Sequence, residues 1–309
     1  MPIGILTNHK EADSWKAALA EKLPNVSIDI YGESKNAVKA PFLVCWKPKK
    51  DQLKVFSNLK VIQSLGAGVD HIFDTNTIPA TVKVVRIIDE RLTVDMWEYV
   101  LTAIMHHLKD FSKYTRQESY QYWQQHRYKT IPETTVAVLG LGQIGGYVAK
   151  QLAKIGFKVL GWSNSPKKIR KVKNYIGQKQ LQTLLKKTDV LVNILPLTDA
   201  TQGILNKDLF QQLPKDAYVI NVGRGGHLVE MDLLDCIENK HLAGATLDVF
   251  AQEPLSPNHP FWKEPKIKIT PHVASLTNVE SAVNQVVENY NRMVRGVELL
   301  NEVSPIKGY

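Results

Sequence analysis

The chain has 309 residues, which suggests two domains at about 150 residues each. Its 44% hydrophobic and 22% charged residues are typical of a globular enzyme and exclude a disordered or fibrous chain. Two cysteines, Cys45 and Cys236, exclude a disulfide framework and a cysteine-rich metal site. The longest apolar runs are shorter than the ~20 residues of a membrane-spanning helix.

The net charge is unusual and local. Thirty-nine Lys and Arg against 30 Asp and Glu give +9, a balance that suits a nucleic-acid or membrane-surface binder. However, residues 134–188 hold 11 basic and no acidic residues, whereas the rest of the chain holds 28 basic and 30 acidic residues. We call 134–188 the basic segment. Because the excess is confined to it, we expect a small anionic ligand there and neither nucleic acid nor a membrane as partner.

Short apolar runs alternate with helical stretches along the chain, which indicates an α/β protein with parallel sheets. In the first third, strands are predicted over 3–6, 42–46 and 61–65, and an amphipathic helix over 13–22. The first residues lack the charged lead and long apolar run of a signal peptide. Together with the cysteine usage, this predicts a cytoplasmic protein.

A long apolar-rich helix is predicted over 94–111, and an aromatic, weakly periodic segment follows over 119–131. Both segments contain more apolar and aromatic residues than a linker within a monomer needs. We therefore expect a symmetric homodimer formed through this region.

A second α/β unit opens with a strand over 135–139 and a helix over 147–155. Further elements follow in the same alternation. Strands are predicted over 158–161, 190–195, 217–221, 244–247 and 267–270, and a last helix over 278–295.

A glycine-rich turn joins the first strand and helix of this second unit. Its sequence, Gly140-Leu141-Gly142-Gln143-Ile144-Gly145, matches G-x-G-x-x-G. In this strand–turn–helix setting, glycines let the backbone turn tightly and approach a pyrophosphate, whose charge lies at the helix N-terminus. The motif therefore predicts a dinucleotide-binding domain.

The residues about 20 positions further on indicate which dinucleotide. An NAD site usually has a carboxylate there, but the sequence reads Ser163-Asn164-Ser165-Pro166-Lys167-Lys168. Ser163 and Asn164 can donate hydrogen bonds, and Lys167 supplies a charge opposite to that of a 2′-phosphate. We therefore expect NADP(H) as the preferred cofactor, with NAD(H) as the alternative.

Three further polar residues follow predicted strands in the C-terminal third: Arg224, Glu253 and His272. In a doubly wound sheet the carboxyl ends of the strands converge on the cofactor crevice, so these side chains can meet. A guanidinium can bind a carboxylate bidentately, and an imidazole beside a carboxylate can donate a proton near neutral pH. These are the groups that carbonyl reduction needs. His227, close to Arg224, is a second candidate for the proton donor. We find no metal-ligand pattern among the histidines.

With these motifs in order, the sequence resembles the D-isomer-specific 2-hydroxyacid dehydrogenases. The resemblance covers nearly the whole chain and includes the string Leu65-Gly66-Ala67-Gly68-Val69-Asp70. Some details are most similar to the glyoxylate/hydroxypyruvate reductase A branch: Trp46-Lys47-Pro48, Glu98-Tyr99, Trp123, Ser163 and the ending Lys307-Gly308-Tyr309.

The resemblance implies hydride transfer from NAD(P)H to a small 2-oxo acid such as glyoxylate or hydroxypyruvate. His272 then protonates the developing alkoxide, Glu253 holds His272, and Arg224 binds the substrate. The resemblance also implies substrate contacts at Trp46, Gly66, Ala67, Gly68, Arg224 and His272, and cofactor contacts at Leu195, Pro196, Val222, Gly223, Arg224, Asp248, His272 and Ala274 beside those named above.

The implied fold has two Rossmann-like domains with doubly wound parallel sheets and a cleft between them. Residues 1–97 plus 279–309 would form the substrate-binding domain, and 98–278 the dinucleotide-binding domain. Two alternatives stay open. One is a non-catalytic dinucleotide-sensing module of the corepressor type; the other is a dehydrogenase of another D-2-hydroxy acid, such as lactate or phosphoglycerate.

Overall fold

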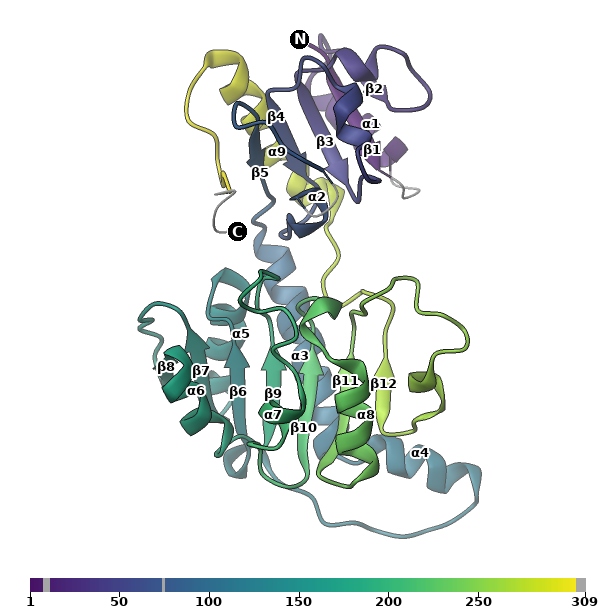
Figure 1. Cartoon of the computed structure of the whole chain (residues 1–309), viewed down its shortest axis with the longest axis vertical. Coiled ribbons are helices and arrows are strands. Elements are labelled where there is room, and N and C mark those ends of the chain that lie inside the picture. Colours follow the sequence, from purple (N-terminus) through teal and green to yellow (C-terminus); the bar gives the residue numbers. More distant parts are fainter. Residues whose placement is uncertain (8–11, 74–75, 304–309) are drawn as a thin grey trace. The chain divides into compact units, whose positions relative to one another are not determined.

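The computed structural model describes residues 1–7, 12–73 and 76–303. The chain forms two compact units, one of Met1–Leu92 with Leu276–Tyr309 and the other of Thr93–Ser275 (Figure 1). The boundaries expected from the sequence lie a few residues later along the chain. The predicted α/β class with two parallel sheets is confirmed. The ending Lys307-Gly308-Tyr309, which contributed to the resemblance, lies outside the described residues.

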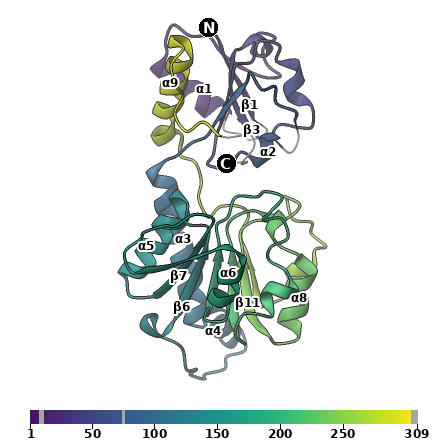
Figure 2. The ribbon, with the colours of Figure 1, turned by 60° about the vertical axis from the view of Figure 1, so that its left-hand side comes forward.

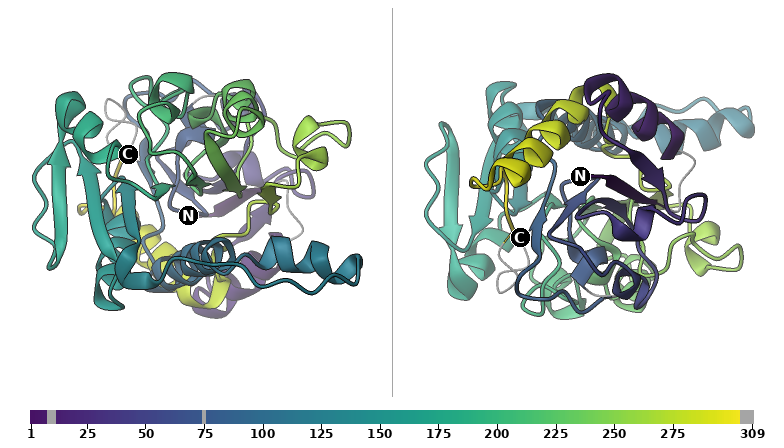
Figure 3. Two further views of the ribbon diagram at one scale, coloured as in Figure 1. Left: turned by 90° about the horizontal axis from the view of Figure 1, so that it is seen from below. Right: turned by 90° about the horizontal axis from the view of Figure 1, so that it is seen from above.

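The first unit contains a five-stranded parallel sheet with the order β2-β1-β3-β4-β5. Its strands are β1 (Ile3–Thr7), β2 (Ile28–Ile30), β3 (Phe42–Trp46), β4 (Val61–Ser64) and β5 (Lys83–Val85), and α2 (Asp70–Phe73) follows β4. Helices α1 (Ala12–Lys22) and α9 (Val279–Arg295) pack side by side (Figure 3). Their apolar side chains, such as Leu19 and Val286, are buried against the sheet, so residues from both ends of the chain build one core.

The second unit contains a seven-stranded parallel sheet with the order β12-β11-β10-β9-β6-β7-β8. Its strands are β6 (Thr135–Leu139), β7 (Lys158–Ser163), β8 (Val172–Ile176), β9 (Val190–Asn193), β10 (Ala217–Asn221), β11 (Leu242–Leu247) and β12 (Ile267–Ile269). The chain runs outward from β6 to β8 and then returns to β9 on the other side of β6. This reversal of strand order is the place where open α/β sheets bind their ligands.

Helices cover both faces of this second sheet. They are α3 (Glu90–Leu108), α5 (Gln143–Lys154), α6 (Gly177–Leu185), α7 (Lys207–Phe210) and α8 (Glu230–Glu238), whereas α4 (Phe111–Ser119) has no buried residue. Figure 2 shows α3 and α5 on one side and α6 and α8 on the other. An apolar core lies on each face of the sheet, and successive side chains of a strand point to opposite faces. In β6, Val136 and Val138 pack in the core with α3 and α5, whereas Ala137 and Leu139 pack in the core with α6, α7 and α8.

Two features differ from the sequence-based expectation. The helix predicted over 94–111 corresponds to α3, which ends three residues earlier, at Leu108. Asp110, in the left-handed region with φ 54°, separates it from α4, a second helix that was not predicted. The short edge strands β2, β5 and β8 were not predicted. Among the described helices, none is both long and apolar enough to cross a membrane.

The histidine at the end of α3 predicts a pH-dependent stability. The His107 ring stacks on Tyr218 of β10 with centroids 4.0 Å apart, and burial lowers the pKa of His107 from 6.5 to about 4. Below pH 6.5, His107 becomes protonated in the unfolded chain but stays neutral in the folded chain. The contribution of His107 to the free energy of unfolding is therefore complete above pH 6.5 and is lost as the pH falls towards 4. We expect His107 to account for about 2 kcal/mol of acid destabilisation.

The measurement is urea unfolding of the wild type and His107→Phe at pH 7 and pH 4.5. Phenylalanine preserves a ring stacked on Tyr218 but cannot titrate, so the variant should lose less stability on acidification. The carboxylates contribute equally in both proteins. An equal loss in the two proteins would contradict the prediction.

Candidate active site

His272 and Glu253 form a hydrogen-bonded pair at neighbouring strand ends. His272 follows β12 and Glu253 follows β11, and His272 Nδ1 lies 2.9 Å from Glu253 Oε2. The other carboxylate oxygen accepts from the Phe250 N–H at 3.2 Å. The two side chains are 29% and 22% exposed, so a ligand can reach them. With Nδ1 engaged by Glu253, Nε2 is the ring nitrogen that can face a substrate.

Asp248 anchors the loop that carries His272. Asp248 is 1% exposed, and its carboxylate accepts three hydrogen bonds, from Thr270 Oγ1 at 2.6 Å, Val273 N at 2.8 Å and Ala274 N at 2.9 Å. The Asp248 carbonyl also accepts from the His272 N–H at 2.8 Å. Sequence reasoning missed this anchoring role, and the contact of Asp248 with a cofactor stays a prediction.

Arg224 lies in the loop after β10, directly against the loop that carries Glu253. A Cβ atom on Gly225 would lie 1.8 Å from the Phe250 carbonyl carbon, so only glycine permits this approach. The Arg224 Nη1 donates to the Gly223 carbonyl at 2.9 Å, and the Arg224 carbonyl accepts from Asn221 Nδ2 at 3.1 Å. The ends of β10, β11 and β12 therefore present Arg224, Glu253 and His272 in one region of the second unit.

His227, the second candidate for the acid, is fully buried behind this loop. Its Nε2 lies 3.1 Å from the Pro196 carbonyl, which requires a proton on Nε2. Its Nδ1 then accepts from Asn193 Nδ2 at 2.9 Å and from Arg224 N at 3.1 Å. Both ring nitrogens thus hold backbone and amide groups in place, and this geometry excludes His227 as the proton donor.

The glycines after β6 fit a dinucleotide for three different reasons. Gly140 has φ +97°, and a Cβ there would meet the Ile194 carbonyl oxygen at 2.8 Å. A Cβ on Gly145 would lie 1.8 Å from the Gly140 oxygen, which closes the turn. A Cβ on Gly142, the N-cap of α5, would meet nothing within 4 Å. Open space thus adjoins a helix N-terminus, as a pyrophosphate needs.

The other predicted cofactor residues lie at the ends of the same strands. Ser163 ends β7 and is 7% exposed, while Asn164 and Lys167 are exposed. In the loops after β9, β10 and β12, the structure places Leu195, Val222, Gly223 and Ala274 as buried residues and Pro196 as an exposed one. No Asp or Glu stands in the basic segment, so nothing there repels a 2′-phosphate.

The predicted substrate loop belongs to the first unit and is shaped by Ser64. The Gly66 N–H donates to Ser64 Oγ at 3.3 Å, and Ser64 Oγ donates to the Gly68 carbonyl at 2.8 Å. Within residues 1–7, 12–73 and 76–303, the N–H groups of Ala67 and Gly68 have no protein acceptor. These two groups are therefore suited to bind a carboxylate.

Trp46, at the end of β3, packs against this loop. A Cβ on Gly66 would meet the indole Cζ3 at 2.6 Å, and the indole packs on the His71 ring with centroids 4.4 Å apart. Trp46 therefore lies beside the predicted substrate loop, and its contact with a substrate stays a prediction. Arg224, Glu253, His272 and the cofactor residues all belong to the second unit.

The close approach of Trp46 and Gly66 gives a prediction for Gly66→Ala. The added methyl group forces the indole to move, so we expect the free energy of unfolding of the first unit to fall by about 1–3 kcal/mol. For the 2-oxo acid that the resemblance implies as substrate, we expect the KM to rise. The affinity for NADPH should not change. Urea unfolding and steady-state kinetics check this, and adding Trp46→Phe should relieve the clash. A Gly66→Ala protein with wild-type stability and KM would refute it.

Comparison with known proteins identifies the class. The family model described as D-isomer specific 2-hydroxyacid dehydrogenase, NAD binding domain, matches residues 100–274. The chain therefore belongs to the D-isomer specific 2-hydroxyacid dehydrogenases, the family that the sequence resembles. In the described part of the chain, no group of three His, Cys, Asp or Glu residues could hold a metal ion.

Within this family, the chain is similar to glyoxylate/hydroxypyruvate reductase A. The Yersinia enterocolitica protein of that name is 39% identical over 304 residues, which cover 97% of each chain. A D-isomer specific 2-hydroxyacid dehydrogenase from Xanthobacter autotrophicus Py2, crystallised with NADPH and MES, is 34% identical with a TM-score of 0.93 over 100% of this chain and 99% of that chain. An NADPH-dependent glyoxylate/hydroxypyruvate reductase from Sinorhizobium meliloti, crystallised with NADP and sulfate, is 35% identical with a TM-score of 0.92 over the same shares.

Proposed function

We propose that this protein reduces glyoxylate and hydroxypyruvate to the corresponding 2-hydroxy acids with NADPH, in the cytoplasm. The observation that carries this proposal is the His272–Glu253 hydrogen bond at 2.9 Å on loops adjoining Arg224. The names of the similar proteins, which are glyoxylate/hydroxypyruvate reductases, support the choice of substrate. Carbonyl reduction needs a proton donor and a carboxylate-binding cation, and these three residues supply both.

Each catalytic side chain has one task. His272 Nε2 holds the proton that the substrate oxygen receives, Glu253 orients the ring and balances the imidazolium charge, and Arg224 binds the substrate carboxylate or carbonyl. In the first unit, the Ala67 and Gly68 N–H groups are a further candidate for binding a carboxylate. Release of the proton leaves His272 neutral, so it must be reprotonated from solvent before the next turnover.

The cofactor site is proposed to consist of the turn Gly140–Gly145, the end of β7 and the loops after β9, β10 and β12. When bound, the nicotinamide supplies a hydride for the carbonyl carbon of the substrate. The N-terminus of α5 at Gly142 would hold the pyrophosphate. Asn164 and Lys167 would face the 2′-phosphate, which no carboxylate of the basic segment repels.

The test is NADPH oxidation, followed by absorbance, with glyoxylate, hydroxypyruvate, pyruvate and bulkier 2-oxo acids. We expect turnover with the two small acids and a higher kcat/KM than with the bulkier ones. The control is His272→Ala, which should still bind NADPH but lacks the proposed proton donor. Absence of turnover by the wild type with every 2-oxo acid would refute the reductase proposal.

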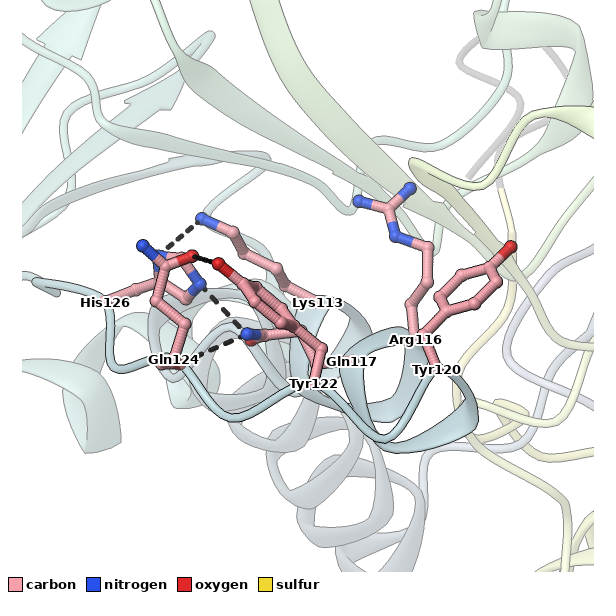
Figure 4. A pocket seen from close by; sticks show the side chains of 7 residues that line it. All are labelled: Lys113, Arg116, Gln117, Tyr120, Tyr122, Gln124 and His126. Atoms are coloured by element: carbon pink, nitrogen blue, oxygen red, sulfur yellow. Dashed lines mark hydrogen bonds between the residues drawn. The ribbon is translucent and has the colours of Figure 1, made fainter.

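We also propose a homodimer formed through α4 and residues 120–130, which we call the arm. No residue of α4 is buried, and Figure 1 shows α4 beyond the β12 edge of the sheet. The arm has its own ordered structure: Lys113 Nζ lies 3.0 Å from His126 Nδ1, and Gln117 Oε1 lies 3.2 Å from His126 Nε2 (Figure 4). Trp123 on this arm is 93% exposed. A second copy that covers the arm would bury these apolar surfaces.

Light scattering coupled to size exclusion tests the dimer. We expect a dimeric mass for the wild type and a monomeric mass for Trp123→Glu. Trp262→Glu is the matched control, because Trp262 is also exposed but lies outside the arm. A monomeric wild type would overturn the proposed dimer.

A further inference from the structure

The loop at the end of β7 is held by a side chain that the sequence analysis did not single out. We call residues 163–168 the specificity loop. Asn174 lies on β8, which pairs with β7 so that Asn174 is opposite Gly161. Its Nδ2 donates to Ser163 Oγ at 2.9 Å and to the Gly161 carbonyl at 3.3 Å, and its Oδ1 accepts from the Lys167 N–H at 2.8 Å.

These bonds fix the orientation of the amide. The Lys167 N–H is a donor and the Gly161 carbonyl is an acceptor, so only one assignment of the Asn174 oxygen and nitrogen satisfies both. One side chain thus joins the beginning of the specificity loop to its end. The loop is closed further by Ser163, whose hydroxyl donates to the Ser165 carbonyl at 2.8 Å.

The network determines what the specificity loop offers to a ligand. The buried Ser163 hydroxyl donates its hydrogen to the Ser165 carbonyl and accepts a hydrogen bond from Asn174 Nδ2. This hydroxyl therefore stabilises the conformation of the loop. Residues 164–168 are all exposed, and their polar side chains are Asn164, Ser165, Lys167 and Lys168. They are donors and cations, which suit the oxygens of a phosphate, whereas a ribose 2′-hydroxyl is best recognised by a carboxylate acceptor.

We propose that Asn174 is a positioning residue for cofactor specificity: by fastening Ser163 and Lys167, it holds the specificity loop in the conformation that receives the 2′-phosphate of NADP(H). This inference rests on the proposed use of NADPH. Asn174 itself acts through the loop. Removing it frees Ser163 and lets the Lys167 backbone move, so the 2′-phosphate should lose affinity while the rest of the cofactor keeps its contacts at Gly142 and α5.

The experiment measures binding of two fragments that lack nicotinamide, 2′,5′-ADP and 5′-AMP, by calorimetry. For the wild type we expect tighter binding of 2′,5′-ADP. In Asn174→Leu its Kd should rise about tenfold, as expected for the loss of one or two ordering hydrogen bonds, while the Kd of 5′-AMP stays within about twofold of the wild type. In steady state, the KM for NADPH should rise with an unchanged kcat, and the KM for NADH should stay the same.

Two further variants make the result specific. Asn174→Asp is nearly isosteric and keeps an acceptor for Lys167 N, but it cannot donate to Ser163 and it brings a negative charge, so 2′,5′-ADP should bind more weakly still. Lys173→Gln removes one positive charge from the same strand without touching the loop network, and it should weaken 2′,5′-ADP much less than Asn174→Leu does.

The outcomes separate the two proposals. If wild-type protein binds 5′-AMP and 2′,5′-ADP equally, the proposed use of NADPH is wrong. If the wild type prefers 2′,5′-ADP and Asn174→Leu retains that preference, only the role of Asn174 is overturned. Unchanged binding of 5′-AMP by the variants shows that the second unit is folded, so weak binding of 2′,5′-ADP then supports the inference.

Discussion

Replacement of His272 by alanine is expected to lower kcat for glyoxylate reduction about 100- to 10,000-fold, the usual contribution of a positioned general acid. The His272 backbone is held by Asp248, and the Asp248 carboxylate is satisfied by Thr270, Val273 and Ala274. None of these bonds involves the imidazole. The substitution should therefore leave the loop in place and remove only the proton donor.

Glu253→Gln tests the partner of His272 separately. Glutamine can still accept a hydrogen bond from Nδ1, but it carries no charge to balance an imidazolium. We expect kcat to fall about 10- to 150-fold, which corresponds to the ~1.5–3 kcal/mol of a hydrogen bond to a charged group. The double variant should be no worse than His272→Ala, because Glu253 acts through His272.

The measurements are kcat and KM with glyoxylate, together with the Kd of NADPH by fluorescence. The Kd should stay close to that of the wild type in both variants. A His272→Ala enzyme that retains kcat within about threefold, far below the effect of a lost general acid, would show that another group donates the proton.

Strands could be predicted from the sequence where their residues are continuously apolar and buried, and they could not be predicted at most edges of the sheets. Central strands such as β6 and β10 are buried along most of their length, so each is a visible apolar run. The edge strand β8 carries Lys173 and Asn174 and is mostly half-buried or exposed, and the surrounding lysines conceal its alternation. Apart from Phe111 and Tyr114, helix α4 is polar, and none of its residues is buried, so no apolar run indicates it.

The same distinction applies to the candidate site. Arg224, Glu253 and His272 could be proposed because strand ends converge in a parallel sheet and because their residue types suit the chemistry. The residues that hold the site loops in place could not be proposed from the sequence. Nothing in the sequence indicates that Asp248 binds the His272 loop or that Asn174 fastens residues 163 and 167, because a polar side chain does not reveal its partner until the strands are paired.

Replacement of Arg224 by glutamine is expected to lower kcat/KM for glyoxylate about 100- to 1,000-fold, equivalent to the ~3–4 kcal/mol that a bidentate guanidinium–carboxylate pair can contribute in a partly buried site. The loop should keep its conformation, because Gly225 packs on the Phe250 backbone and the Arg224 N–H and carbonyl are bound by His227 and Asn221. These contacts depend on the backbone and persist in the variant.

Arg224→Lys is the matched variant, since lysine restores the charge but not the planar pair of donors. If Arg224 binds the carboxylate bidentately, Arg224→Lys should recover only a small part of kcat/KM, and added guanidinium should restore activity to Arg224→Gln with saturable dependence. If Arg224 acts only through its charge, lysine should recover most of the activity. Wild-type kcat/KM in Arg224→Gln would show that the substrate carboxylate is bound elsewhere, and the Ala67 and Gly68 N–H groups would then be the first alternative to test.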